Sequence, residues 1–315
     1  KDLLSTVNVS AGSNFKNQML GNIGSLYNQG IEFAINAVLV DTKNFKWDLG
    51  YNVAWNQNKI TQLLSDDEDY FVPVGGISSG TGNTIQAHKV GEAAYSFLVY
   101  ETKKMTDEQG VTRHYFVDRN QDGQINDNDK YIYHSPAAPV TMGLQTKFQF
   151  YGFDLGITMR ANIGNYVYND VLASNLQWVE ADKVFQNQNG GYHSVLKSAF
   201  NCYYGDNMRS DDIRTYVWNK ETQAYEVGVD KGALIKNSNW YASDFFVEKA
   251  SFLRIDNITL GYSFNKTVQG RAYITVSNPC VFSAYKGLDP EVGGGIDNNI
   301  YPRSMTTVMG VSLQF

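Results

Sequence analysis

The stretch "KWDLGYNVAWN" at residues 46–56 decides the fold. Its odd positions carry large apolar side chains, namely Trp47, Leu49, Tyr51, Val53 and Trp55. Its even positions carry small, polar or charged residues, among them Lys46, Asp48, Gly50, Asn52 and Asn56. Successive side chains of a β-strand point to opposite faces, so this period of two predicts an amphipathic strand of about ten residues.

The same alternation recurs along the chain. It precedes the stretch in "IEFAINAVL" at residues 31–39 and returns in 141–150, 153–162, 257–264 and 305–315. Tyr151 and Gly152 form a tight turn between two of these segments. We count roughly nine or ten strand segments, and the first residues resemble a loop that leads into a strand. The sequence therefore predicts an all-β architecture that begins before residue 1.

Two architectures compete for such strands. Strands of a soluble β-sandwich run about five to six residues and turn their apolar face into a core. Strands of a transmembrane antiparallel β-barrel run ~9–11 residues and turn that face to lipid, with aromatic residues near both membrane interfaces. The strand length and the positions of Trp47, Tyr51 and Trp55 favour the barrel. The charged residues at inner positions favour it too, because burial of these charges in a sandwich core would cost free energy.

The connections between strands alternate in length. Short ones lie at 40–46 and 151–152, and long polar ones lie at 65–90 and 165–245. Outer-membrane barrels have short periplasmic turns and long extracellular loops. The pattern therefore predicts a barrel with long extracellular loops.

Composition narrows the class of protein further. The 315 residues include 21 Tyr, carry a net charge of −6 and contain no basic stripe, which argues against a nucleic-acid partner. The two cysteines, Cys202 and Cys280, are far apart, and two unrelated thiols are favoured over a disulfide. No apolar run reaches the ~18–20 residues of a membrane-spanning helix, and the start lacks the pattern of a signal peptide.

Several stretches are distinctive, namely "NIGSLYNQGIEFAINA", "VGEAAYSF", "FYGFDLGITMRANIGNYVYN", "SFLRIDNITLGYSF" and "YKGLDPEVGGGIDNNIYPRSMTTVMGVSLQF". These stretches resemble the SusC-like (RagA/SusC) TonB-dependent outer-membrane transporters. The last two are the most specific. Cys280 stands where the family more often has an aromatic or aliphatic residue, and residues 170–240 match poorly.

This resemblance implies an architecture and a function. Residues 1–315 would be the C-terminal part of a 22-stranded barrel, and the plug and the TonB-contacting segment would lie upstream. The protein would lie in the outer membrane of a Gram-negative bacterium and import a glycan or oligopeptide with energy supplied through TonB. A SusD-like surface lipoprotein would cover the barrel, and no bond would be broken by this chain.

The loop "DRNQDGQINDND" at residues 118–129 is a candidate cation site. Asp118, Asn120 and Asp122 stand where a calcium-binding EF-hand loop has its first ligands, and Gly123 stands at its sharp turn. Gln124 would add a carbonyl oxygen, and Asp129 would replace the usual final Glu. Strand-like sequences flank the loop, so we expect a Ca²⁺-binding loop between barrel strands with no sensor role. The alternative is an Asx-rich turn that binds nothing.

The remaining candidates are weaker signals. Phe315 ends the last strand and, by the resemblance, would be the signal for insertion into the outer membrane. Exposed aromatic residues of the long loops could stack on sugar rings or contact the covering lipoprotein. The candidates for this role are Trp178, Tyr204, Trp218 and Trp240. The four histidines and the serines form no catalytic motif, so we do not expect an enzyme, and a barrel lipase is disfavoured.

The alternative function comes from a different class of protein. A soluble, calcium-stabilised β-sandwich could bind carbohydrate at an aromatic surface. It would be soluble without detergent, whereas the barrel would not.

Overall fold

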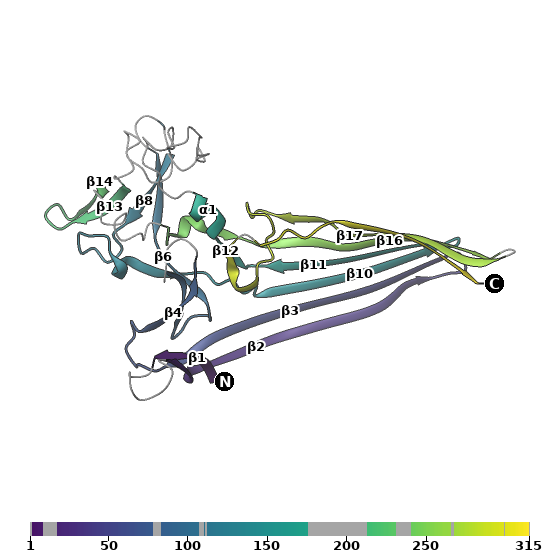
Figure 1. Cartoon of the computed structure of the whole chain (residues 1–315), viewed down its shortest axis with the longest axis horizontal. Coiled ribbons are helices and arrows are strands. Elements are labelled where there is room, and N and C mark those ends of the chain that lie inside the picture. Colours follow the sequence, from purple (N-terminus) through teal and green to yellow (C-terminus); the bar gives the residue numbers. More distant parts are fainter. Residues whose placement is uncertain are drawn as a thin grey trace.

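In the computed structural model, the described residues are 2–8, 18–77, 83–106, 110, 112–175, 213–230, 241–265, 268–298 and 300–314. They form one large curved sheet and, at one end of it, a compact body made by the long connections, which we call the cap (Figure 1). No described helix is long and apolar enough to cross a membrane.

The large sheet has eight strands and is antiparallel throughout. Its spatial order is β1 (Asp2–Asn8), β2 (Gln18–Asp41), β3 (Phe45–Leu63), β10 (Val140–Phe150), β11 (Phe153–Ile163), β16 (Phe252–Asn265), β17 (Gln269–Ser283) and β19 (Thr306–Gln314). The strands of this sheet are arranged in the order in which they occur along the chain, and the strands missing from this order belong to the cap.

The register turns the apolar positions of neighbouring strands to the same face. Trp55 pairs with Val140, which pairs with Ile163. Ten residues further along β10, toward the short turns, Phe150 pairs with Phe45 on one side and with Phe153 on the other. These three residues form a second apolar row. The rows continue to the last strand through pairs such as Leu155 with Leu260, Leu260 with Ile274, and Ile274 with Met309. One face of the sheet is therefore apolar from β2 to β19.

No other sheet of the described chain covers this apolar face. Large side chains on it remain exposed, including Ile31 at 73%, Phe33 at 56% and Val311 at 66%. A soluble sandwich would bury these side chains against a second sheet. The soluble alternative is thus not favoured, and the exposed face is what a lipid-facing wall requires.

An aromatic belt crosses the apolar face near the short turns. Trp47 stacks on Phe148 with ring centroids 5.4 Å apart. Phe150 stacks on Phe153 at 5.6 Å, and Phe153 contacts Tyr262 at 4.6 Å. The belt spans β3, β10, β11 and β16, where a barrel places its interfacial girdle. Tyr51, expected at an interface, instead lies in the middle of the band, between the rows of Trp47 and Trp55.

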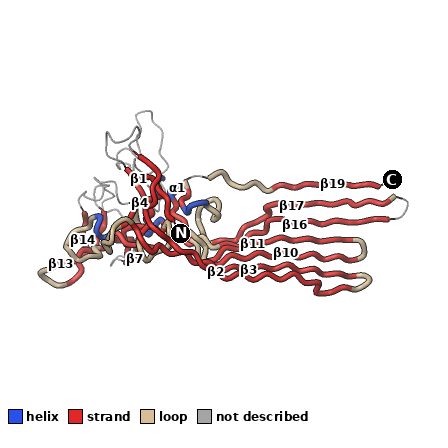
Figure 2. The backbone as a smooth tube through the Cα atoms, turned by 90° about the horizontal axis from the view of Figure 1, so that it is seen from below, coloured by secondary structure: helices blue, strands red, loops and turns tan. Residues whose placement is uncertain are grey.

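The connections separate into short and long ones as predicted, but the first long one runs over 64–139 rather than 65–90. Those at 42–44 and 151–152 lie at one end of the sheet, where β16 ends, β17 begins and to which β19 also runs (Figure 2). The described residues of the connections 64–139, 164–251 and 284–305 lie at the other end. The third of these long connections was not expected. β2 and β3 have 24 and 19 residues, longer than the expected ten, because they continue past the apolar band into polar sequence such as Asn56–Lys59.

The described residues of the cap form three small sheets. The first joins β4 (Phe71–Gly76), β5 (Thr84–Lys89), β6 (Ser96–Tyr100) and β9 (Lys130–Tyr133). The second joins β14 (Ala224–Asp230), β13 (Ile213–Asn219), β8 (Thr112–Val117) and β7 (Thr102–Thr106). The third joins β15 (Val247–Lys249), β12 (Tyr166–Asn169) and β18 (Ile296–Asp297). Short helices lie at α1 (Asp170–Asn175), η1 (Asp127–Asp129), η2 (Asp244–Phe246) and η3 (Gly293–Gly295).

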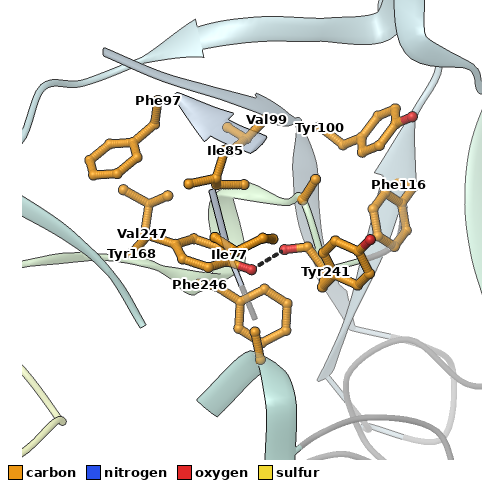
Figure 3. Packing of buried hydrophobic residues seen from close by; sticks show 12 residues of the cluster. Ile77, Ile85, Phe97, Val99, Tyr100, Phe116, Tyr168, Tyr241, Phe246 and Val247 are labelled. Atoms are coloured by element: carbon orange, nitrogen blue, oxygen red, sulfur yellow. Dashed lines mark hydrogen bonds between the residues drawn. The ribbon is translucent and has the colours of Figure 1, made fainter. Parts of the chain in front are cut away.

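The main apolar core of the described chain lies in the cap, not under the large sheet. Phe97, Phe116, Tyr168 and Phe246 are fully buried in it and come from two long connections (Figure 3). The hydroxyl of Tyr168 donates a hydrogen bond of 2.9 Å to the carbonyl oxygen of Tyr241. Ile296 of the third connection packs against the same core. The long connections therefore share one core and form one body.

Candidate functional site

The inner face of the large sheet is polar and carries ion pairs. Arg271 on β17 donates to both carboxylate oxygens of Asp154 on β11, at 3.1 and 2.7 Å. The pair crosses the intervening strand β16 directly above Gly261, where an added Cβ would lie 2.5 Å from the Asp154 carboxylate. Glycine at this position therefore allows a bidentate pair to lie flat across three strands.

Other glycines of the inner face have the same effect. A Cβ on Gly50 would meet the side chain of Asn36, and a Cβ on Gly143 would meet that of Asn52. Polar side chains thus lie along the wall rather than projecting from it. Asn36, Asn52 and Gln145 line a shallow depression of about 330 Å³ on this face. The wall offers amide, hydroxyl and charged groups to whatever passes it.

The loop at 118–129 is closed by hydrogen bonds from its own backbone and by one from β13. The Asp118 carboxylate accepts from the N–H groups of Asp122, Gly123 and Trp218 at 3.2, 2.9 and 3.1 Å. The Asp129 carboxylate accepts from Arg119, Asn120 and Asn126 at 2.8, 3.1 and 2.7 Å. Positive φ angles of 61° at Gln121 and 93° at Gly123 make the sharp bend.

The predicted ligands Asp118, Asn120 and Asp122 lie close together in the loop. Asp118 and Asp129 are both fully buried. Burial, and secondarily the Asp118 carboxylate, raise the pKa of Asp129, whereas the Gln124 N–H lowers the pKa of exposed Asp122. Within the described residues, no three carboxylate, imidazole or thiol side chains converge closely enough to hold a metal ion.

The loop also fastens a hairpin of the cap. The hydroxyl of Tyr225 on β14 donates to the carbonyl oxygen of Asp118 at 3.0 Å, and the Gln121 side chain reaches that hydroxyl at 3.3 Å. The loop joins β8 to β9, which belong to two different sheets of the cap. The expectation that it joins two barrel strands was therefore wrong, because strand-like sequence on both sides cannot reveal which sheet a strand joins.

The structure describes only some of the other predicted residues. Trp218 is half-buried and packs edge to face on Tyr225, with ring centroids 5.1 Å apart. Cys280 is a half-buried thiol on β17. The other residues singled out in the sequence lie outside the described residues, namely Trp178, Tyr204, Trp240, Phe315 and Cys202. The role of the aromatic residues in contacting substrate or the lipoprotein, and the role of Phe315 in insertion into the outer membrane, stay predictions.

Sequence reasoning missed a cluster of charges at the cap end of the inner face. Arg160 and Arg254 pair with acidic residues of the connection 284–305, with Glu291 between them. The sequence signal for this cluster was an arginine at an inner position of each of two strands, together with the two acidic residues of "GLDPEVGGG". It was not used because the partners are far apart in sequence.

An apolar outer face with an aromatic belt, a charged inner face and alternating turn lengths define the wall of a transmembrane antiparallel β-barrel.

No family model matches the chain. It is 46% identical over 325 residues to the TonB-dependent receptor SusC of Bacteroides thetaiotaomicron, a match that covers 100% of this chain and 29% of that protein. The TonB-dependent receptor P39 of Formosa agariphila is 24% identical, over 100% of this chain and 33% of that protein.

Solved structures agree on the fold. The RagAB peptide importer in its open-open state matches with a TM-score of 0.67 and 22% identity, over 100% of this chain and 31% of that chain. The chain thus spans about a third of the length of the proteins it matches. The predicted relationship to the SusC-like (RagA/SusC) TonB-dependent transporters is confirmed, and the chain corresponds to part of such a barrel.

Proposed function

We propose that this chain is the C-terminal part of the barrel of an outer-membrane importer for glycans or oligopeptides. The register of the large sheet carries the proposal, because it turns apolar side chains outward and charged or amide side chains inward on every strand from β3 to β17. A polar inner wall suits hydrated solutes with many hydrogen-bonding groups. The likeness to a receptor named SusC and to a peptide importer keeps both solute classes in the proposal.

In this proposal the wall takes part in transport without chemistry. A plug formed by the preceding part of the protein would close the lumen, and TonB would supply the energy that rearranges it. The solute would then pass along residues such as Asn52, Gln145 and Asp154. A SusD-like lipoprotein would cover the cap end, and the short turns would face the periplasm of a Gram-negative bacterium.

The test compares uptake with and without the full-length transporter. Cells that lack it are given a mixture of labelled oligosaccharides or a mixture of labelled oligopeptides. We expect uptake of one mixture to fall, to return with the intact gene, and to stay low when TonB is absent. Uptake of both mixtures that is unchanged by the deletion would refute the function.

We also propose that the loop at 118–129 binds Ca²⁺ as a structural ion. The support is the burial of two neighbouring carboxylates, Asp118 and Asp129, whose mutual repulsion a divalent cation would offset. Hydrogen exchange of the intact transporter is compared in Ca²⁺ and in EDTA. Ca²⁺ should slow exchange in 118–129 and in the hairpin 213–230, and Asp118→Asn should remove this difference. Equal exchange in both buffers would contradict the proposal.

A further inference from the structure

The connection between β17 and β19 folds onto the inner face of the barrel wall. We call its described residues, 284–298 and 300–305, the mouth segment. Arg160 on β11 and Arg254 on β16 are paired in register and point to the inner face, since their neighbours Ala161 and Leu253 belong to the outer rows. The acidic residues that bind these arginines, Asp289 and Glu291, belong to the mouth segment. The segment therefore lies inside the cap end of the lumen.

Six charged residues hold the segment to the wall. Glu291 accepts from Arg160 at 2.6 Å and lies 2.8 Å from Arg303 and 3.4 Å from Arg254. Arg254 also donates to Asp289 at 2.5 Å, and both of these side chains are at most 5% exposed. Asp256 lies 3.0 Å from Arg160. Three positive and three negative side chains thus balance, and removal of any buried member leaves an unpaired charge.

Two irregularities in the wall orient this cluster. The register between β16 and its neighbours shifts at Asp256, which is an extra residue relative to β11. On β17, Asn278 has a φ of 55°, accepts from Arg254 at 2.7 Å and donates to the carbonyl of Ser304 at 3.4 Å. Bulges and strained residues of this kind are typical of functional positions in sheets.

The middle of the segment, between Glu291 and Arg303, is fixed in the cap. The side chain of Gln86 donates to the carbonyl of Gly294 at 2.8 Å, and β18 pairs with β12. Gly295 has a φ of 78°, and a Cβ added there would lie 2.2 Å from the ring of Pro136. In contrast, a Cβ on Gly293 would meet nothing within 4 Å. The segment is thus attached both to the wall and to the rigid core of the cap.

We propose that the mouth segment is a fixed constriction that sets the upper size of the solute admitted to the lumen. The inference rests on the proposed import function and adds its size selection. A segment attached at both places stays in the lumen while solute passes, unlike a lid that swings away. Two guanidinium groups of the cluster are partly exposed, namely that of Arg160 on the wall at 38% and that of Arg303 on the segment at 43%.

The first test measures attachment, with no need for transport. Trypsin is added to outer membranes that contain the intact transporter, and cleavage after Arg303 is followed by mass spectrometry. The wild-type protein should resist cleavage there. Asp289→Asn and Gly295→Ala should each be cut roughly tenfold faster or more, while the matched control Gly293→Ala stays resistant. Wild-type cleavage as fast as that of the variants would overturn the attachment.

The second test measures size selection. Cells with each variant take up the same oligosaccharide and oligopeptide mixtures, and the length distribution of the imported molecules is compared. Asp289→Asn and Gly295→Ala should import longer molecules than the wild type, and Gly293→Ala should not. An unchanged length distribution, with trypsin cleavage increased, would overturn the constriction but leave the import function intact. A wild type that imports neither mixture would overturn the import function, and the size selection with it.

Discussion

The substitution Ile157→Arg tests the assignment of the two faces with a definite magnitude. Ile157 is on β11 in the row of Leu49, Thr146 and Ile258, on the apolar face. The strand from Phe153 to Ile163 covers ten steps of ~3.3 Å, about 33 Å along the strand. With a tilt of ~40° this gives an apolar band about 25 Å tall, the thickness expected for an outer-membrane barrel.

On this scale Ile157 lies about 10 Å above the short-turn edge of the band, close to its middle. An arginine at the middle of the bilayer costs ~2–4 kcal/mol in a barrel, which corresponds to a roughly 30-fold to several-hundred-fold loss of folded protein relative to unfolded protein. At Ile163, on the edge of the band, the same substitution should cost about 0–1 kcal/mol.

The assay follows the folded fraction of the full-length protein in outer membranes, read from heat-modifiable migration on gels. Thr158→Arg is the matched control, because Thr158 is the next residue on the same strand and pairs with Gln145 and Asn257 on the inner face. We expect Ile157→Arg to lose folded protein and Thr158→Arg to keep it. Equal losses for both, or a loss only for Thr158→Arg, would refute the assignment of the faces.

Three further outcomes follow from the packing and the charges. Phe97→Ala should destabilise the cap by ~3–5 kcal/mol and leave the large sheet intact, as seen in hydrogen exchange of each part. Gly30→Ala should cost ~1–3 kcal/mol, because its Cβ would lie 2.5 Å from the backbone oxygen of Trp55, whereas Gly156→Ala meets nothing within 4 Å and should be neutral in a melting experiment. Burial lowers the pKa of three cap histidines, so their contribution to stability is present above their ordinary pKa of about 6.5 and is lost as the pH falls below it. Acidification should therefore speed exchange in the cap, less so in His114→Gln, and a cap unaffected by pH would contradict this. The histidines are His88, His114 and His134.

The wall was predictable from the sequence because its signal is local. Each strand repeats an apolar and polar alternation that needs no knowledge of its neighbours, so residues 46–56 alone define a face. The short turn at Tyr151–Gly152 follows equally from adjacent residues, which take positive φ angles of 48° and 87°.

The cap and the mouth segment were not predictable in the same way. Their organisation depends on contacts between residues such as Arg160 and Glu291, which are 131 positions apart. Nor could periodicity distinguish a strand of the barrel from a strand of the cap, which is why the loop after β8 was assigned to the wall. Side-chain pairing across distant segments depends on the tertiary fold, not on local propensity.

Spin-label accessibility along β11 tests the central claim most directly, namely that this sheet is a barrel wall between lipid and an aqueous lumen. Single labels at positions 154–159 of the full-length protein in bilayers are exposed to oxygen and to a water-soluble nickel complex. A barrel wall requires labels at Leu155, Ile157 and Met159 to contact oxygen and those at Asp154, Gly156 and Thr158 to contact nickel. Odd positions shielded from both reagents would place those side chains in a protein core, and the sheet would then not be a barrel wall.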